Sequence, residues 1–296
     1  LTFDVPSHIR DKAISYVVDM LDGALTKPIE LGDIEITPQG ASGIGYSCCS
    51  TKSNALRNHW DVSVEYLQRY KEYPPPLWTY MHKKGEVLPT EKATKMVRPI
   101  IYSPFHFYAL QKVHTQELDE RMKSKPATWF SYGKNVLGRH FSDVYRNLSQ
   151  YTTLFKGDCT KFDSGIGPDA FEVIRDIRKR LSSQSSHEAL DFIYEQLSHK
   201  FVRLPNSAVV LDTRQPSGQA CTTSDNSIFH AFAIAASYLM SCEDRGIDTS
   251  DYHRLISDNL FVHLYSDDHI AATSDAHFSK FSVRSSYYAR LGLLLK

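Results

Sequence analysis

The spacing of apolar residues predicts several amphipathic helices. A helix beginning at Pro168 is indicated by Phe171, Ile174, Ile177 and Leu181, which recur at intervals of three and four residues. Similar spacing predicts further helices over residues 54–71, 105–122, 187–199, 222–241 and 279–293. Before residue 125 the pattern is broken by Pro and Gly, so the chain there is expected to be irregular between its helices.

Short β-branched and aromatic runs predict strands in the second half of the chain. Residues 151–155 (YTTLF) are typical of a buried strand, and residues 201–213 of a hairpin. Residues 260–265 and 269–272 read as two paired strands joined at Ser266, Asp267 and Asp268. From residue 151 on, strands and helices follow each other in an order that predicts an α+β fold, a small antiparallel sheet with helices on one face.

Composition narrows the class of protein. The 296 residues are 42% hydrophobic and 12% aromatic, which is typical of a globular chain. Its 34 basic and 34 acidic residues cancel, so overall charge says nothing about nucleic acid. Five cysteines without CxxC spacing favour a reducing compartment and argue against structural zinc. No membrane span or signal peptide is expected, and the chain ends on an apolar run, so we expect a fragment of a longer protein.

Three carboxylates are expected at one end of this sheet. Asp158 follows the strand at 151–155, while Asp267 and Asp268 stand at the tip of the 260–272 hairpin. Neighbouring like charges raise each other's pKa or recruit a cation, and an all-oxygen donor set selects Mg²⁺ or Mn²⁺. Such a site suits phosphoryl transfer. An isolated Asp-Asp pair, however, is more often a solvated turn.

Three motifs that follow one another along the chain favour the metal site over the solvated turn. They are DCTKFD from Asp158 to Asp163, SGQACTTSDN from Ser217 to Asn226, and YSDD at residues 265–268. Together they resemble motifs A, B and C in the palm of viral RNA-dependent RNA polymerases of positive-strand viruses. The second motif is similar to those of astrovirus-like and potyvirus-like enzymes in the picornavirus-like group. Ser266 departs from the glycine of most of those families, and SDD looks more like nidoviruses.

The resemblance covers residues 35–296 and implies a right-hand polymerase fold. Fingers are expected mainly over residues 1–150, and an RRM- or ferredoxin-like palm over 151–296 that includes a fingers segment at 183–216. The thumb is expected to be missing, and a polyprotein origin is implied. Motif D would begin near the end of the chain. Lys296 is closer to Gly292 than the family pattern suggests, so we do not assign it the general-acid role of the motif D lysine.

The resemblance also implies roles for individual residues. Asp158 and Asp267 would hold two metal ions, with Asp268 a weaker or second-shell ligand. Residues 83–98 are rich in lysine and resemble motif F, in which Lys95 and Arg98 would bind the triphosphate. The residues implied around the ribose are Asp163, Ser217, Thr222 and Asn226. Simpler readings stay open: a solvated basic loop for the lysines, a turn former at Asp163, a plain loop at 217–218, and a helix cap at Thr222 or Asn226.

The implied activity is RNA-directed RNA synthesis. NTPs would be added to the 3′-hydroxyl of nascent RNA on an RNA template, with no DNA involved. The resemblance further implies the host cytoplasm, membrane-associated replication complexes and other viral replication proteins as partners. A reverse transcriptase would carry an aromatic residue in place of Asp163. A nuclease would not need the Ser217–Asn226 motif, and a non-catalytic RNA-binding module would carry stacking aromatics in place of the carboxylates.

Overall fold

The computed structural model describes residues 3–46, 51–73, 76–83, 99–125, 129–131, 133 and 139–296. The chain forms two compact units, each built from separate stretches of sequence. The first unit comprises Leu1–Thr26, Glu117–Gln184 and Thr223–Lys296, and the second comprises Lys27–Gln116 and Ser185–Thr222. Among the described residues, no helix is both long and apolar enough to cross a membrane.

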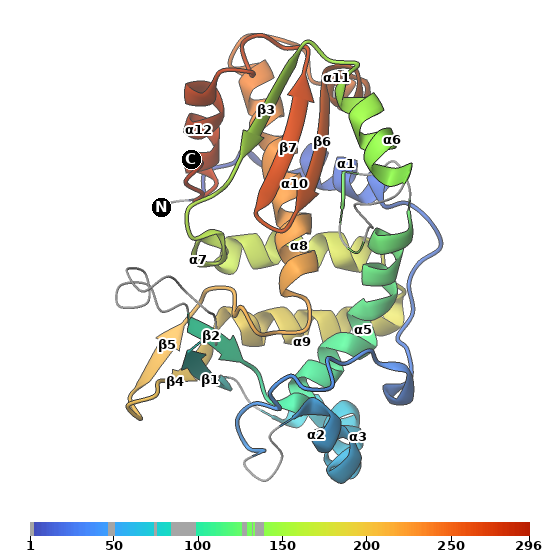
Figure 1. The fold of residues 1–296 in the computed structure, drawn as a ribbon, viewed down its shortest axis with the longest axis vertical. Coiled ribbons are helices and arrows are strands. Elements are labelled where there is room, and N and C mark those ends of the chain that lie inside the picture. Colours follow the sequence, from blue (N-terminus) through green and yellow to red (C-terminus); the bar gives the residue numbers. More distant parts are fainter. Residues whose placement is uncertain are drawn as a thin grey trace. The chain divides into compact units, whose positions relative to one another are not determined.

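The first unit contains a three-stranded antiparallel sheet (Figure 1). Its strands are β3 (Thr153–Gly157), β7 (Asp268–Thr273) and β6 (Leu260–Tyr265), in that order across the sheet. The hairpin expected over residues 260–272 is therefore confirmed. Strand β3 begins two residues later than expected, because Tyr151 still donates its amide to Leu148 at the end of the preceding helix. Residues 129–131 add a short parallel bridge along β6.

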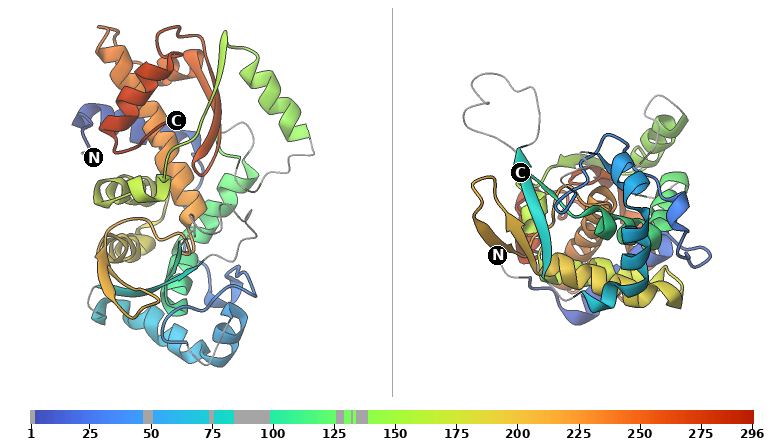
Figure 2. Two further views of the ribbon diagram at one scale, coloured as in Figure 1. Left: turned by 60° about the vertical axis from the view of Figure 1, so that its left-hand side comes forward. Right: turned by 90° about the horizontal axis from the view of Figure 1, so that it is seen from below.

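Helices pack against both faces of the sheet in the first unit. His269 and Phe155 face helices α10 and α12, where His230 contacts the His269 ring and Arg284 lies over the Phe155 ring. The opposite face is covered in part by α6 (Figure 2). Leu154 on β3 remains 59% exposed. The helices of this unit are α1 (Ser7–Met20), α6 (Arg139–Leu148), α7 (Phe162–Gly165), α8 (Pro168–Arg180), α10 (Thr222–Glu243), α11 (Tyr252–Asn259) and α12 (Phe281–Arg290).

Helix α10 is buried on all sides from Ser224 to Cys242, with no polar face toward solvent. Its apolar residues fill the core of the first unit, with Phe229 contacting Phe162 and Phe232. A helix surrounded by other elements has no solvent-facing stripe, which explains why its polar residues, such as Ser227 and His230, are also buried. Buried polar side chains must find hydrogen-bond partners, and several of these belong to the candidate site.

The second unit has a four-stranded sheet in the order β2, β1, β4, β5. The hairpin expected over residues 201–213 is confirmed as β4 (Lys200–Arg203) and β5 (Val209–Asp212). Strand β4 of this hairpin pairs in parallel with β1 (Leu77–Lys83). On its other side β1 pairs antiparallel with β2 (Pro99–Tyr102). The right-hand view of Figure 2 shows β1 beside this hairpin.

The helices of the second unit surround a core formed by Phe105, Tyr108, Leu31 and their neighbours. Helix α5 (Phe105–Ser124) begins in this unit and ends in the first, and α9 (His187–Ser198) matches its expected bounds closely. The single helix expected over residues 54–71 is wrong. The chain instead forms α2 (Lys52–Asn58) and α3 (Trp60–Arg69), because His59 between them has the non-helical angles φ −132° and ψ 38°. The described residues also contain short 3₁₀ turns at Leu31–Asp33, Tyr70–Glu72 and Gln184–Ser186.

Candidate active site

The register of the sheet brings three carboxylates to one end. Gly157 is paired with His269, so Asp158, which follows β3, lies opposite Asp268 at the start of β7. Tyr265 pairs with Asp268, which leaves Ser266 and Asp267 as a two-residue loop. Asp158, Asp267 and Asp268 therefore gather at the same sheet end, as the sequence predicted. We call them the carboxylate cluster.

The charges of the carboxylate cluster act on one another. Burial, followed by the charges of Asp267 and Asp158, raises the pKa of Asp268. Burial is also the main cause that raises the pKa of the neighbouring Cys159 thiol to about 12, with the same two aspartates adding to it. The cluster is consequently a region of concentrated negative charge, in which a cation lowers the electrostatic energy.

One lysine reaches this cluster from the end of the chain. Residues 294–296 run beside 158–160, with Thr160 donating its amide to Leu294 and Lys296 donating its amide to Asp158. This backbone pairing places Lys296 Nζ 2.8 Å from Asp158 Oδ2, and the hydrogen bond raises the pKa of Lys296. Sequence spacing had left Lys296 without a role. Its position depends on the pairing of two segments that are more than a hundred residues apart in the sequence. No local sequence pattern indicates such a pairing.

The donor chemistry of the cluster fits a divalent cation. All three side chains offer carboxylate oxygens, the ligands that hard cations prefer, and their mutual repulsion favours binding one. Across the described parts of the chain, however, no three His, Cys, Asp or Glu side chains are arranged around a common point that could hold a metal ion. In this structure Lys296 supplies the positive charge beside Asp158.

A second set of contacts links two of the residues expected at the ribose. Asp163 lies in α7, and Asn226 is the fifth residue of α10. Asn226 Nδ2 donates to Asp163 Oδ1 at 2.7 Å and to Ser266 Oγ at 3.1 Å. The structure thus brings Asp163 and Asn226 together, and joins both to the loop that carries Asp267.

The other two ribose candidates belong to the second unit. The Ser217 hydroxyl lies 3.4 Å from the Ile101 amide, and Gly218 donates its own amide to the Ile101 carbonyl at 2.9 Å. A Cβ atom at Gly218 would lie only 2.6 Å from that carbonyl oxygen, so this close approach requires glycine. Thr222 donates its hydroxyl to the Pro216 carbonyl at 2.9 Å and so closes the 216–222 loop. Lys95 and Arg98, expected at the triphosphate, lie outside the described residues.

A buried histidine of α10 forms a hydrogen bond with the hairpin loop. His230 Nδ1 is 2.9 Å from the Ser266 carbonyl, which can only accept, so this nitrogen donates. Its Nε2 then accepts from the Tyr288 hydroxyl at 3.3 Å. Burial lowers the pKa of His230 to about 4, consistent with a neutral ring. His230 follows Asn226 by four residues on α10, so helical spacing was a signal that could have identified it.

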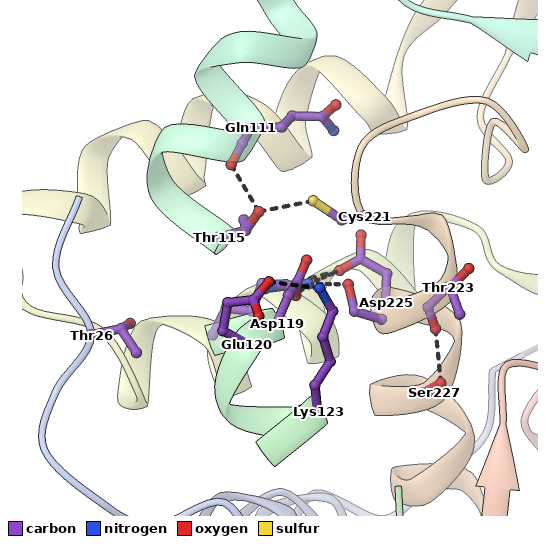
Figure 3. A network of polar contacts seen from close by, with 12 residues as sticks. Thr26, Gln111, Thr115, Asp119, Glu120, Lys123, Cys221, Thr223, Asp225 and Ser227 are labelled. Atoms are coloured by element: carbon purple, nitrogen blue, oxygen red, sulfur yellow. Dashed lines mark hydrogen bonds and ion pairs between the residues drawn. The ribbon is translucent and has the colours of Figure 1, made fainter. Parts of the chain in front are cut away.

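A buried ion-pair network holds the start of α10. The Arg178 side chain, 1% exposed, donates through Nε to Asp225 Oδ1 at 2.8 Å and through Nη2 to Asp119 Oδ1 at 3.1 Å. A third hydrogen bond, of 2.9 Å, joins its Nη2 to Ser224 Oγ. Figure 3 shows Asp119 of α5 and Asp225 of α10 at this network. Because Asp225 precedes Asn226, the network anchors the helical turn that presents Asn226.

Comparisons with known proteins agree with this arrangement. The family model of viral RNA-dependent RNA polymerases matches residues 37–294. Genome polyprotein 1 of Barley mild mosaic virus (strain Na1) is 29% identical over 162 residues, covering 54% of this chain and 6% of that polyprotein. The non-structural polyprotein 1AB of Mink astrovirus 1 is 24% identical over 258 residues, covering 78% of this chain and 18% of that polyprotein.

A solved structure extends the likeness to the whole chain. The Sicinivirus 3Dpol RNA-dependent RNA polymerase superposes with a TM-score of 0.79 at 14% sequence identity, covering 100% of this chain and 64% of that one. At this identity the match concerns the fold, and it confirms the expected α+β polymerase architecture. The polyprotein relatives come from the astrovirus and potyvirus-like groups that the second motif indicated. Since the family model covers most of its length, the chain belongs to the viral RNA-dependent RNA polymerase family.

Proposed function

We propose that this chain is the catalytic region of an RNA-directed RNA polymerase, which adds NTPs to the 3′-hydroxyl of nascent RNA on an RNA template. The observation that carries the proposal is the sheet register, which sets Asp158 opposite the Asp267-Asp268 loop. The chain spans only a small part of the viral polyproteins it matches, so activity, substrates and partners belong to this proposal.

Enzymes of this family generally use divalent metal ions, and we assign Mg²⁺, with Mn²⁺ as a substitute, to the carboxylate cluster. Asp158 and Asp267 would hold the ions, and Asp268 would contribute more weakly. When bound, such cations lower the pKa of an attacking hydroxyl and stabilise the charge on the phosphates. Lys296 would compete with a cation at Asp158, because its ammonium group already contacts Oδ2 of the same carboxylate.

The chain's own polar residues would select the sugar and bind the triphosphate. Asp163 and Asn226, joined at 2.7 Å, would recognise the 2′-hydroxyl, which deoxynucleotides lack. A site built to bond a hydroxyl discriminates against the analogue without it, because its polar groups are left unpaired. The ribose roles of Ser217 and Thr222 and the triphosphate roles of Lys95 and Arg98 follow from motif resemblance and stay predictions.

The proposed function also gives each unit a subdomain and gives the protein its partners and cellular location. We assign the palm to the first unit and the fingers to the second; the division expected near residue 150 stays a prediction, as does the fingers segment at 183–216. The partners would be template RNA, nascent RNA and other viral replication proteins, in membrane-associated replication complexes of the host cytoplasm. A-form RNA is bound through its shape, phosphates and 2′-hydroxyls, so binding should be insensitive to sequence and should weaken with salt.

Two alternatives predict different residues at the site. A reverse transcriptase-like enzyme would exclude the 2′-hydroxyl with an aromatic ring where this chain has Asp163 bonded to Asn226. A non-catalytic RNA-binding module would gain nothing from three carboxylates, which repel phosphate when no cation is bound. Both observations favour RNA synthesis from ribonucleotides.

Primer extension tests the proposal. An RNA primer on an RNA template should be extended with NTPs in the presence of Mg²⁺ or Mn²⁺, and far less with dNTPs. Asp267→Ala should lower the rate by about 100-fold or more, since a metal site contributes several kcal/mol to phosphoryl transfer. Asp258→Ala, at an exposed helix position, is the control for loss of one carboxylate. Unchanged extension by the Asp267→Ala protein would overturn the assignment.

A further inference from the structure

Ser266 adopts a backbone conformation that ordinarily favours glycine. Its φ is +57°, in the left-handed region, where a side chain is strained. Glycine would relieve this strain. The serine therefore calls for a contribution from its hydroxyl that offsets the strain.

That hydroxyl contacts the residue proposed to recognise the ribose. Ser266 Oγ accepts a hydrogen bond from Asn226 Nδ2 at 3.1 Å. The Ser266 backbone is held separately, because its amide donates to Ser227 Oγ at 2.9 Å and its carbonyl accepts from His230 Nδ1 at 2.9 Å. The loop position is thus maintained through the backbone, and the hydroxyl is available to act on Asn226.

The contacts determine which way the Asn226 amide is turned. A carboxylate only accepts, so the Asn226 NH₂ group must face Asp163, and its second hydrogen is taken by Ser266 Oγ. Both donors of the amide are then used. Asn226 Oδ1 is buried and has no hydrogen-bond partner in the described part of the structure. An acceptor left in this state is unfavourable, and a donating hydroxyl from a ligand would satisfy it.

We propose that Ser266 is a positioning residue for ribose selection, which holds the Asn226 amide so that Oδ1 is the acceptor for the 2′-hydroxyl of the incoming nucleotide. The inference rests on the proposed polymerase function and adds a specificity role to the loop that carries Asp267. Ser266 itself acts through Asn226. Removal of its hydroxyl frees one amide hydrogen, so the amide loses a constraint and the preference for ribonucleotides falls.

The test compares Ser266→Gly and Ser266→Ala, using primer extension with NTPs and dNTPs. Both changes remove the hydroxyl, so the ratio of kcat/KM for NTP over dNTP should fall in both by about 2- to 10-fold, the range for one neutral hydrogen bond. The two changes differ in backbone strain, since only glycine relieves it. The glycine variant should therefore have the higher Tm of the two, while the loss of selectivity is similar.

A matched control is available in the second unit. Ser207 also has a left-handed φ, +67°, in an exposed turn, so Ser207→Gly repeats the chemical change away from Asn226 and should leave the selectivity ratio unchanged. An unchanged ratio in both Ser266 variants would overturn the inference and leave the polymerase function intact. A parent protein that incorporates neither NTPs nor dNTPs would overturn the polymerase function and the inference with it.

Discussion

Lys296 Nζ lies 2.8 Å from Asp158 Oδ2, so the carboxylate proposed to bind a cation forms an ion pair with a lysine. The two side chains are 59% and 41% exposed, and pairs of this kind are worth at most about 1 kcal/mol. A divalent cation that competes with the lysine for Asp158 therefore loses at most about this amount of binding free energy.

Replacing Lys296 should strengthen cation binding. In Lys296→Ala the competing charge is removed, and we expect the dissociation constant for Mg²⁺ to fall by about 2- to 5-fold. Calorimetric titration of Mg²⁺ into the protein without RNA measures this directly. Lys280→Ala, an exposed lysine before α12, should leave the affinity unchanged. Equal or weaker Mg²⁺ binding by the Lys296 variant would show that the pair does not compete with the cation.

Replacing Arg178 should destabilise the protein severely. Arg178→Met leaves Asp119 and Asp225 buried without their cation, and breaking such a network costs about 3–5 kcal/mol of unfolding free energy. Urea unfolding followed by circular dichroism measures the loss. Arg180→Met removes the exposed partner of Asp176 on the same helix, and it should cost less than about 1 kcal/mol. Similar losses for the two variants would contradict the role given to the buried network.

Stability should decrease as the solution is acidified. Burial lowers the pKa of His106, His114 and His230 to about 4 each. Between about pH 6.5 and pH 4 the unfolded chain binds protons that the folded chain does not, so each histidine removes up to about 1.4 kcal/mol of stability per pH unit. Urea unfolding at a series of pH values tests this. His114→Gln should reduce the slope, and a slope equal to that of the parent would show that His114 is not buried in its neutral form.

Gly218→Ala should disturb the second unit locally. The new Cβ would stand 2.6 Å from the Ile101 carbonyl oxygen, which accepts the Gly218 amide, so β2 and the 216–222 loop must separate. Overpacking of this kind costs about 1–3 kcal/mol. Gly167→Ala is the control, because a Cβ there meets nothing within 4 Å. Thermal melts of both proteins provide the comparison, and a Gly218 variant as stable as the control would show that the close approach is not required.

Elements with strong local signals were predicted well from the chain alone. Helix α8 begins at Pro168 as expected, and the β6–β7 hairpin has the expected pairing, because both depend on short-range periodicity and turn chemistry. Helix α1 was missed although Ile9, Ala13 and Val17 recur at helical spacing, so a signal was present there. The two helices α2 and α3 were merged, since nothing in the apolar pattern marks the break at His59.

The sequence by itself determined the candidate carboxylates and the motif order, because these are properties of residue identity and spacing. Only the tertiary structure decided that Asn226 bonds Asp163 and Ser266, that Arg178 anchors Asp225, and that Lys296 contacts Asp158. Each of these contacts joins residues tens to more than a hundred positions apart. They depend on how helices and strands pack, and packing is set by the whole core rather than by any local pattern.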